Sequence, residues 1–403
     1  MHAALLTTLF VSVLPPEFPA FDRQEIDPHA GNVVYALTVA DVNGDGKPDV
    51  CALTEDAIVW YANPTWEKHV ILKGATERDN VTFQAFDLTR NGRIDFALGA
   101  GWNPRDTNTD APIEWAEQAA EGAWKLHPIG GEPTVHRLRF GHVKGEIRPN
   151  LVVVPLQGRS TGGPNWGQGQ GVRILVYSIP DDPTKDPWPL EVADDSLHTV
   201  HNFQLYDWDG DGREEILAAA WEGVFLLQRD DQGKWSRTQI GTGNQETEPF
   251  KGASEIKVGH LRDGRKYIAT IEPWHGHQVV VYTAPDSGEG LWTRRVIDEP
   301  ISWGHAIWVA DLDGDGDEEL IIGQRDPNKE PSDNPVGPGV WVYDPIAGTW
   351  PVEFQRHNID DGGVAVEDAL AADLNGNGRP EIIAGGRASH NVVIYWNQGA
   401  DGS

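Results

Sequence analysis

The sequence predicts an all-β fold: a seven-bladed β-propeller of four-stranded blades, closed by the N-terminal strand joining the last blade. Two repeats and the composition support this prediction. An acidic loop recurs at intervals of roughly 50 to 60 residues, a spacing typical of one blade. An aromatic residue followed by an aliphatic one recurs between the loops. The chain of 403 residues holds 45 Gly and 17 Trp and shows no long amphipathic helical pattern.

Four copies of the acidic loop carry oxygen-bearing side chains at positions 1, 3, 5 and 9 and a Gly at position 6. The first copy reads Asp41-Val-Asn-Gly-Asp-Gly-Lys-Pro-Asp49. It matches the first half of an EF-hand loop, although the acid at position 12 is absent. Because oxygen ligands at this spacing suit Ca²⁺, we expect calcium in these loops. The predicted calcium ligands are Asp41, Asn43, Asp45, Asp49, Asp207, Asp209, Asp211, Glu215, Asp311, Asp313, Asp315, Glu319, Asp373, Asn375, Asn377 and Glu381.

Three weaker copies complete the series of seven loops. They begin at Asp87, His142 and His260 and keep the turn better than they keep the oxygen ligands. In a propeller, the strand that precedes such a loop is the innermost strand of its blade. The loops therefore mark seven inner strands, which start the blades in chain order.

The second repeat predicts the outer edge strand of each blade, because its segments are apolar on one face and charged on the other. Its pairs are Trp66 with Ile71, Trp124 with Ile129, Trp188 with Ala193, Trp235 with Ile240, Trp292 with Ile297, and Phe354 with Ile359. A seventh pair, Phe21 with Ile26, precedes the first loop, and the last blade stops after a third strand at Asn391–Trp396. The N-terminal strand should therefore complete the last blade and hide its edge. Residues 21–399 are expected to form one propeller domain.

The charge and the N-terminal residues indicate which binding partners are excluded and in which compartment the protein is expected. The net charge of −30 argues against binding to nucleic acid or to an anionic membrane. Residues 3–14 are apolar but too few to span a bilayer, so we expect residues 1–20 to be a signal peptide and the protein to be exported, to the periplasm or outside the cell. A buried N-terminal strand is the alternative. The single Cys51 excludes an internal disulfide, and we expect a monomer.

A ring of side chains emerges when the residues six positions before each loop are aligned. They are Tyr35, Val81, His136, His201, Ser254, His305 and Glu367. Because the inner strands converge on the channel, these side chains should meet at the mouth opposite the calcium loops. Imidazoles with a carboxylate suit Zn²⁺, Mn²⁺, Fe²⁺ or Ni²⁺. The predicted ligands are His136, His201, His305 and Glu367, with Glu255 and Asp368 as alternative carboxylates. The competing interpretation is a set of histidines that are only hydrogen-bonded within a β core.

The loop after the second strand of each blade should reach the same mouth. These loops are rich in Trp, Arg and His, which stack on sugar rings, bind oxyanions and transfer protons, respectively. The candidate substrate-binding residues are Trp102, Arg159, Trp221 and Trp274, and the candidate catalytic residues are Tyr35, His275, His277, Arg325, Arg387 and His390. The alternative is that these side chains serve only packing and solubility.

Two family resemblances follow from these motifs. The repeated Asp-x-Asn/Asp-Gly-Asp-Gly loop resembles the FG-GAP/VCBS repeat, whose known members form seven-bladed propellers. Val59-Trp-Tyr-Ala-Asn-Pro64, Glu272-Pro-Trp-His-Gly-His277 and Gly386-Arg-Ala-Ser-His-Asn391 resemble the propeller domain of aldos-2-ulose (anhydrofructose) dehydratase. That resemblance implies metal-assisted elimination of water from a keto-sugar. It carries the metal-ligand role to the predicted ring, and a catalytic or substrate-binding role to His275, His277, Arg387 and His390.

The chemistry implied is β-elimination next to a carbonyl, in which a metal stabilises the enolate, a base takes the α-proton and an acid protonates the leaving oxygen. His275, His277 and Tyr35 are the candidate bases. The leaving group can be water, in a dehydratase, or a sugar, in a keto-glycoside lyase. Two alternatives stay open. One is a polysaccharide lyase that acts on uronic acid polymers. The other is a non-catalytic, calcium-stabilised propeller that binds carbohydrate or protein and needs no inward His ring.

Overall fold

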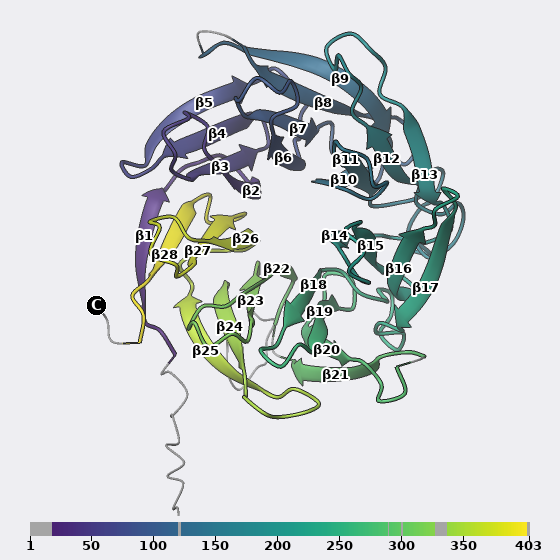
Figure 1. The fold of residues 1–403 in the computed structure, drawn as a ribbon, viewed down its shortest axis with the longest axis vertical. Helices are drawn as coiled ribbons and strands as arrows, with labels where there is room; N and C mark the ends of the chain where they lie inside the picture. The colour runs from purple at the N-terminus through teal and green to yellow at the C-terminus, as the bar shows by residue number, and fades with distance from the viewer. Residues whose placement is uncertain (1–17, 120–121, 289, 300, 327–336, 401–403) are drawn as a thin grey trace, which may run out of the picture.

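The computed structural model describes residues 18–119, 122–288, 290–299, 301–326 and 337–400. Within these ranges the chain forms seven four-stranded antiparallel sheets, arranged as blades around a central axis (Figure 1). The predicted all-β, seven-bladed propeller is thus confirmed. The described residues contain no helix that is long and apolar enough to cross a membrane. Most of the predicted signal peptide lies outside the described residues.

Blades 1 to 6 each run in chain order from an inner to an outer strand. Blade 1 contains β2 (Val34–Ala40), β3 (Asp49–Thr54), β4 (Ala57–Ala62) and β5 (Glu67–Lys73). Blade 2 contains β6 (Thr82–Phe86), β7 (Asp95–Gly99), β8 (Ala111–Gln118) and β9 (Trp124–Glu132). Blade 3 contains β10 (Val135–Gly141), β11 (Asn150–Pro155), β12 (Ile174–Ser178) and β13 (Leu190–Asp194).

The second half of the ring repeats this order. Blade 4 contains β14 (Asn202–Tyr206), β15 (Glu215–Ala220), β16 (Gly223–Arg229) and β17 (Trp235–Gly241). Blade 5 contains β18 (Ile256–His260), β19 (Lys266–Glu272), β20 (Gln278–Thr283) and β21 (Thr293–Asp298). Blade 6 contains β22 (Gly304–Ala310), β23 (Glu319–Gln324), β24 (Gly339–Pro345) and β25 (Phe354–Asp361). The outer strands that the aromatic repeat predicts are all present.

Blade 7 is assembled from both ends of the chain. It contains β26 (Val366–Ala372), β27 (Glu381–Gly386), β28 (Val392–Asn397) and, as its outer strand, β1 (Phe21–Asp27). β1 pairs antiparallel with β28, with Phe21 opposite Asn397 and Gln24 opposite Ile394 (Figure 1). This pairing confirms the predicted closure and covers the edge of β28, which would otherwise expose unpaired backbone groups.

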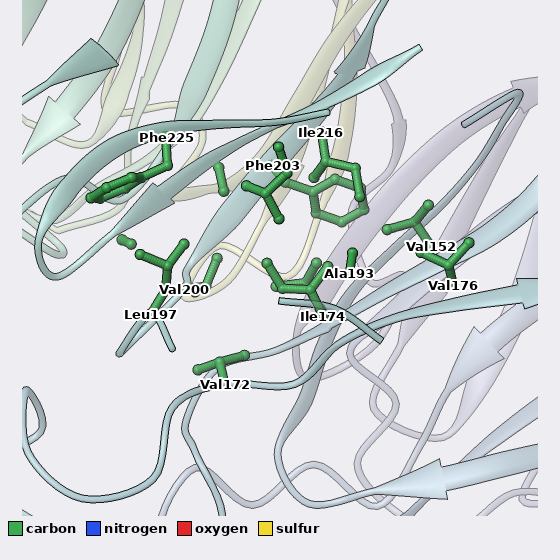
Figure 2. Close-up of a cluster of buried hydrophobic side chains, with 14 of the residues drawn as sticks. Val152, Val172, Ile174, Val176, Ala193, Leu197, Val200, Phe203, Ile216 and Phe225 are labelled. Carbon is green, nitrogen blue, oxygen red and sulfur yellow. The ribbon is translucent and has the colours of Figure 1, made fainter. Parts of the chain in front are cut away.

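The hydrophobic core consists of apolar clusters between neighbouring blades. Figure 2 shows the cluster between blades 3 and 4, where Val152 and Val176 pack towards Phe203 and Ile216. All four side chains are buried. These positions alternate along their strands, because successive side chains of a strand point to opposite faces. Each sheet therefore packs on both neighbours, and the ring has no free sheet face.

The inner strands carry a local irregularity that shapes the channel. In blades 1, 3, 6 and 7 the register with the second strand shifts at the residue six positions before the loop, as in a β-bulge. The bulged residues are Tyr35, His136, His305 and Glu367. Because a bulge places two residues opposite one, it re-aims the side chain that it carries. Four members of the predicted ring therefore owe their direction to a bulge.

The seam between blades 7 and 1 offers a test of ring closure. Ile394 is fully buried in a cluster with Val34 and Val59 of blade 1. We expect Ile394→Ala to lower the free energy of unfolding by about 2–5 kcal/mol, because it leaves a cavity in this seam. Chemical denaturation measures the change. The matched control is Ile147→Ala, at a side chain that is 98% exposed; equal effects of the two substitutions would contradict a closed seam.

Candidate metal centre

Three histidines from different blades converge at the axis of the ring. His201, His275 and His305 each offer a ring nitrogen, and these nitrogens lie within 4.8 Å of one another. The Nε2 atoms of His201 and His275 are 2.8 Å apart. The ring centroids of His201 and His305 are 5.2 Å apart, as are those of His275 and His305. A tetrahedral zinc site holds neighbouring nitrogens about 3.3 Å apart, so a small adjustment would accommodate an ion.

Each histidine reaches the axis by a different route. His201 directly precedes β14, and its backbone N–H donates to Ala219 of the second strand. His305 is the bulged residue of β22. His275 lies in the turn between β19 and β20, with a φ of 50°. Few residues other than glycine adopt a positive φ without strain, and such strain concentrates at functional sites.

The Nδ1 atoms of the ring histidines face acceptors on the next blade. His136 donates from Nδ1 to the carbonyl of His201 at 2.8 Å, and His305 donates to the carbonyl of Glu367 at 2.7 Å. Nδ1 of His201 lies 2.8 Å from a carboxylate oxygen of Glu255. An acceptor at Nδ1 fixes the proton there and leaves Nε2 with a free lone pair. This is the arrangement in which proteins present imidazole to a metal.

The cluster contains two of the four predicted ligands, His201 and His305, and His275 in addition. His136 is buried beside His201, with ring centroids 4.6 Å apart, but its Nε2 lies 3.2 Å from the guanidinium of Arg137. His275, which the sequence suggested as a catalytic residue, takes the third position in the cluster. The alignment at six residues before the loop could not find His275, because this residue comes from a loop and not from an inner strand.

Glu367 stands next to the cluster and is held by two arginines. Its Oε1 is 3.9 Å from Nε2 of His305 and accepts a hydrogen bond from Arg387 at 2.6 Å. Arg325 approaches Oε2 at 3.7 Å, and this buried oxygen has no hydrogen-bond partner among the described residues. Burial raises the pKa of Glu367, while Arg387 and Arg325 act in the opposite direction. A buried carboxylate with an unsatisfied oxygen, next to His305 of the cluster, is a candidate ligand or base.

The imidazoles are held neutral. Burial lowers the pKa of His275 and His305 well below the ordinary value, and the neighbouring histidines and arginines add to this effect. Burial also lowers the pKa of His201, although Glu255 opposes the shift. A metal ligand must be deprotonated, so these environments favour binding of a cation at neutral pH. Burial raises the pKa of Tyr35, which therefore keeps its phenolic proton.

Aromatic side chains surround the histidines. Trp102 lies 4.8 Å from the ring of His136, and Trp274 lies 5.1 Å from that of His275. Trp303, which the sequence analysis did not select, lies 4.9 Å from His275 and carries Arg325 over its face at 4.6 Å. Its sequence position, two residues before His305, was the signal that could have identified it. Two of the predicted sugar-stacking residues and one new one therefore border the centre.

The remaining predicted site residues are exposed or contact other parts of the blades. Arg159 forms ion pairs with Asp110 and Glu132 of blade 2. His277 is exposed, and exposed His390 shares a hydrogen bond of 2.6 Å with the carbonyl of Asn32. Trp221 approaches the backbone of Gly167, where even a methyl group would clash with its indole. None of these contacts is to the His cluster.

The alternative carboxylates lie behind the cluster. Glu255 is buried between His201 and Asn202, which donates a hydrogen bond to it. Asp368 accepts a hydrogen bond of 2.8 Å from the backbone of Leu37, and burial raises its pKa to about 6. Burial lowers the pKa of Lys257, further along the same strand as Glu255, to about 7, and neighbouring Arg139 adds to the shift. Glu255 thus contacts His201 and lies outside the cluster of three histidines.

The acidic loops follow the inner strands, as predicted. The side chain at position 9 of the loop stabilises the turn. Its carboxylate accepts the backbone N–H of position 2, as Asp49 does from Val42 at 2.9 Å and Glu381 from Leu374 at 2.7 Å. In blade 4, Asp207, Asp209 and Glu215 bring oxygen atoms together. The loop's internal hydrogen bonds therefore shape these candidate cation sites.

The loop of blade 6 gathers an additional carboxylate that its motif does not contain. Asp344 of β24 joins Asp313 and Glu319, with oxygen atoms within 4.8 Å. Burial raises the pKa of Glu319 to about 9 and that of Asp344 to about 6, and the neighbouring carboxylates add to both shifts. A divalent cation would relieve this repulsion. The sequence could not reveal Asp344, because it lies on a strand distant from the loop in the chain.

Residues 111–285 match the family model described as the beta-propeller domain of aldos-2-ulose dehydratase, and residues 24–98 match the FG-GAP-like repeat. Aldos-2-ulose dehydratase of Phanerodontia chrysosporium is 30% identical over 282 residues, which cover 64% of this chain. The chain is thus similar to the propeller domain of aldos-2-ulose dehydratase over part of its length, and its N-terminal part is similar to an FG-GAP-like repeat. It spans about 30% of the length of that relative. The predicted resemblance is thereby confirmed.

A solved structure shows the same architecture. A lectin of Agrocybe aegerita, whose structure describes recognition of non-reducing terminal N-acetylglucosamine, matches with a TM-score of 0.50 and 13% identity. The match covers 92% of this chain and 86% of the lectin chain. At this identity the similarity concerns the fold alone.

The His cluster predicts a bound transition metal. We expect about one such ion per chain in the purified protein by elemental analysis, and its loss in His305→Ala, because that variant removes one of three converging nitrogens. The control is His142→Ala, an exposed histidine at the start of an acidic loop. A metal content that is the same in all three proteins would contradict the assignment.

The carboxylate cluster of blade 6 predicts stabilisation by calcium. We expect added Ca²⁺ to raise the melting temperature of metal-free protein, since a ligand that binds only the folded state stabilises it. Asp344→Asn should reduce the rise, because it removes one carboxylate of the cluster. The control is Asp286→Asn, at an exposed position outside the loops. A calcium effect unchanged by Asp344→Asn would show that other loops account for it.

Proposed function

We propose that this propeller catalyses β-elimination on a keto-sugar or keto-glycoside at the mouth that holds His201, His275 and His305. The observation that carries the proposal is their convergence, with Nδ1 of His201 and of His305 facing acceptors on the next blade. The 30% identity to a dehydratase supports the same reaction class. Elimination next to a carbonyl needs stabilisation of an enolate, a base and an acid.

The three imidazoles would hold a divalent transition metal. Such an ion, when bound, supplies a Lewis acid that polarises the keto oxygen of the substrate. Two carbonyls and a carboxylate on the next blades hold His136, His305 and His201 in place. Because these supports belong to the folded ring, two of the three proposed ligands, His201 and His305, are oriented before any ion binds.

Charged and aromatic groups of the same mouth would orient the sugar. Trp102, Trp274 and Trp303 offer indole faces around the cluster. Trp102 also lines a cavity of about 210 Å³ together with Arg78 and Asp106. Aromatic faces with neighbouring hydrogen-bonding groups suit the apolar faces and the hydroxyl groups of a sugar ring.

Tyr35 and Glu367 are the proposed proton-transfer pair. Tyr35 keeps its proton because burial raises its pKa, so it suits the role of the acid that protonates the leaving oxygen. Glu367 suits the role of the base, because burial raises its pKa and Oε2 has no hydrogen-bond partner. Arg387 contacts both residues, donating to Glu367 and lying 5.4 Å from the ring centroid of Tyr35.

Activity is tested on an aldos-2-ulose and on keto-glycosides by following the ultraviolet absorbance of the unsaturated ketone product. We expect Tyr35→Phe and Glu367→Gln each to lower kcat by about 10²- to 10⁴-fold, as for loss of a general acid or base. The control is Tyr206→Phe, at the opposite mouth, where the hydroxyl contacts His260.

Metal content separates the two roles open to Glu367. If Glu367→Gln keeps the metal but loses turnover, Glu367 acts as the base. If the variant loses the metal, Glu367 is a metal ligand. Turnover of uronic acid polymers but not of keto-sugars would favour a polysaccharide lyase. Sugar binding without any product would reject catalysis and leave a carbohydrate-binding propeller.

A further inference from the structure

A second cavity lies in the channel on the side of the acidic loops. Its volume is about 410 Å³, within the range of small-molecule sites, and the inner strands of all seven blades line it. Basic and amide side chains face it, among them Arg139 of blade 3, Gln204 of blade 4 and Lys257 of blade 5. Arg139 and Lys257 both lie three residues before their loops, about 10 Å of extended strand inside the mouth.

Lys257 is a buried lysine that forms no ion pair within the described residues, although Asp368 and Glu255 act on it electrostatically. Only 6% of the residue is exposed. Its Nζ lies 4.0 Å from the ring centroid of Trp308, and among the described residues it makes no hydrogen bond or ion pair. A buried lysine is almost always paired, because removing an ammonium group from water is costly unless an anion or acceptors replace the water.

Arg139 next to it is only partly satisfied. It donates to the amide oxygen of Asn202 at 3.0 Å and stacks over Phe203 at 4.9 Å. Both partners are neutral, and among the described residues Arg139 forms no ion pair. The side chain of Gln204 lies on the strand between the two cations, and its amide oxygen accepts the backbone N–H of Val258 at 2.7 Å. The two cations thus face the cavity with neutral groups between them.

The acidic groups of this cavity are engaged elsewhere. Asp368 accepts the backbone N–H of Leu37. At the rim, Glu214 accepts the backbone N–H of His142, and Glu318 is bound by the backbone and the ring of His260. These contacts engage the carboxylates with backbone groups of neighbouring blades, and no carboxylate forms an ion pair with Lys257 or Arg139 in the described ranges.

We propose that the channel binds a small oxyanion, a carboxylate or a phosphate, between Arg139 and Lys257. Guanidinium and ammonium groups are the usual partners of such anions, and charge-assisted hydrogen bonds are about twice as strong as neutral ones. Arg137 lines this cavity and contacts Glu255, which in turn contacts His201, so these two residues lie between the cavity and the His cluster. Tyr35, the proposed acid, also lines this cavity, but the contacts proposed here for the anion depend neither on a metal nor on the elimination.

The test is to titrate the full chain with inorganic phosphate and, separately, with gluconate. The buffer contains chloride as its only anion. Calorimetry and thermal unfolding report binding. We expect saturable binding of at least one of the two at one site per chain, with a rise in the melting temperature. The anion with the higher affinity identifies the preferred chemistry. Absence of binding by both anions overturns the proposal.

Substitutions then locate the site. Lys257→Met should weaken binding by about tenfold or more, because it removes one of two charge-assisted contacts. Its melting temperature without the anion should not fall, since it removes an unpaired buried charge. The matched control is Lys266→Met: Lys266 also lies 4.0 Å over an indole ring, that of Trp208, but outside the cavity. Equal affinities of wild type and Lys257→Met overturn the assignment.

A measurement on the wild type keeps the test valid if Lys257→Met does not fold. Acylation of lysines by an amine-reactive reagent, read by mass spectrometry, should be slowed at Lys257 by the anion and unchanged at Lys266. Equal rates at Lys257 with and without the bound anion would place the anion elsewhere and reject the site.

Discussion

Ring closure is the constraint on which the rest of this structure depends. The pairing of β1 with β28 joins the two ends of the chain and completes the last blade. Once seven blades pack face to face, their inner strands must share one axis, because each sheet is covered by both neighbours. Side chains that are hundreds of residues apart then become neighbours, as Leu37 and Asp368 do through their hydrogen bond. The site follows from closure and not from any local segment.

Within that ring, β-bulges decide which side chains enter the channel. The bulged residues include His305 and Glu367, which face each other across the boundary of blades 6 and 7. A regular strand would alternate between the channel and the blade, so adjacent residues could not both reach the axis. The bulge lets Glu367 reach the His cluster while its neighbour Asp368 faces the second cavity. The same β-bulge therefore places one residue at the His cluster and the next residue at the second cavity.

Electrostatics divides the channel into two chemically different parts. At one mouth, burial keeps the imidazoles of His275 and His305 neutral, which favours a cation. On the other side, Lys257 and Arg139 form no ion pair with a carboxylate of the described residues, which favours an anion. Arg137 and Glu255 lie between the two parts and contact each other at 3.9 Å. The first part therefore offers neutral imidazoles to a cation, and the second offers basic groups to an anion, and burial has already removed water from both sets of groups.

The sequence by itself determined the fold, the number of blades, the closing strand and the ring of residues that includes His201 and His305. It could do so because these features repeat at a fixed period, and each repeat forms one blade. Only the tertiary structure decided that His275 completes the cluster, that Trp303 borders it and that Asp344 joins a loop of blade 6. These residues come from irregular loops or from another strand, where no period predicts their position. Packing across blades sets their directions, and that packing exists only once the ring is closed.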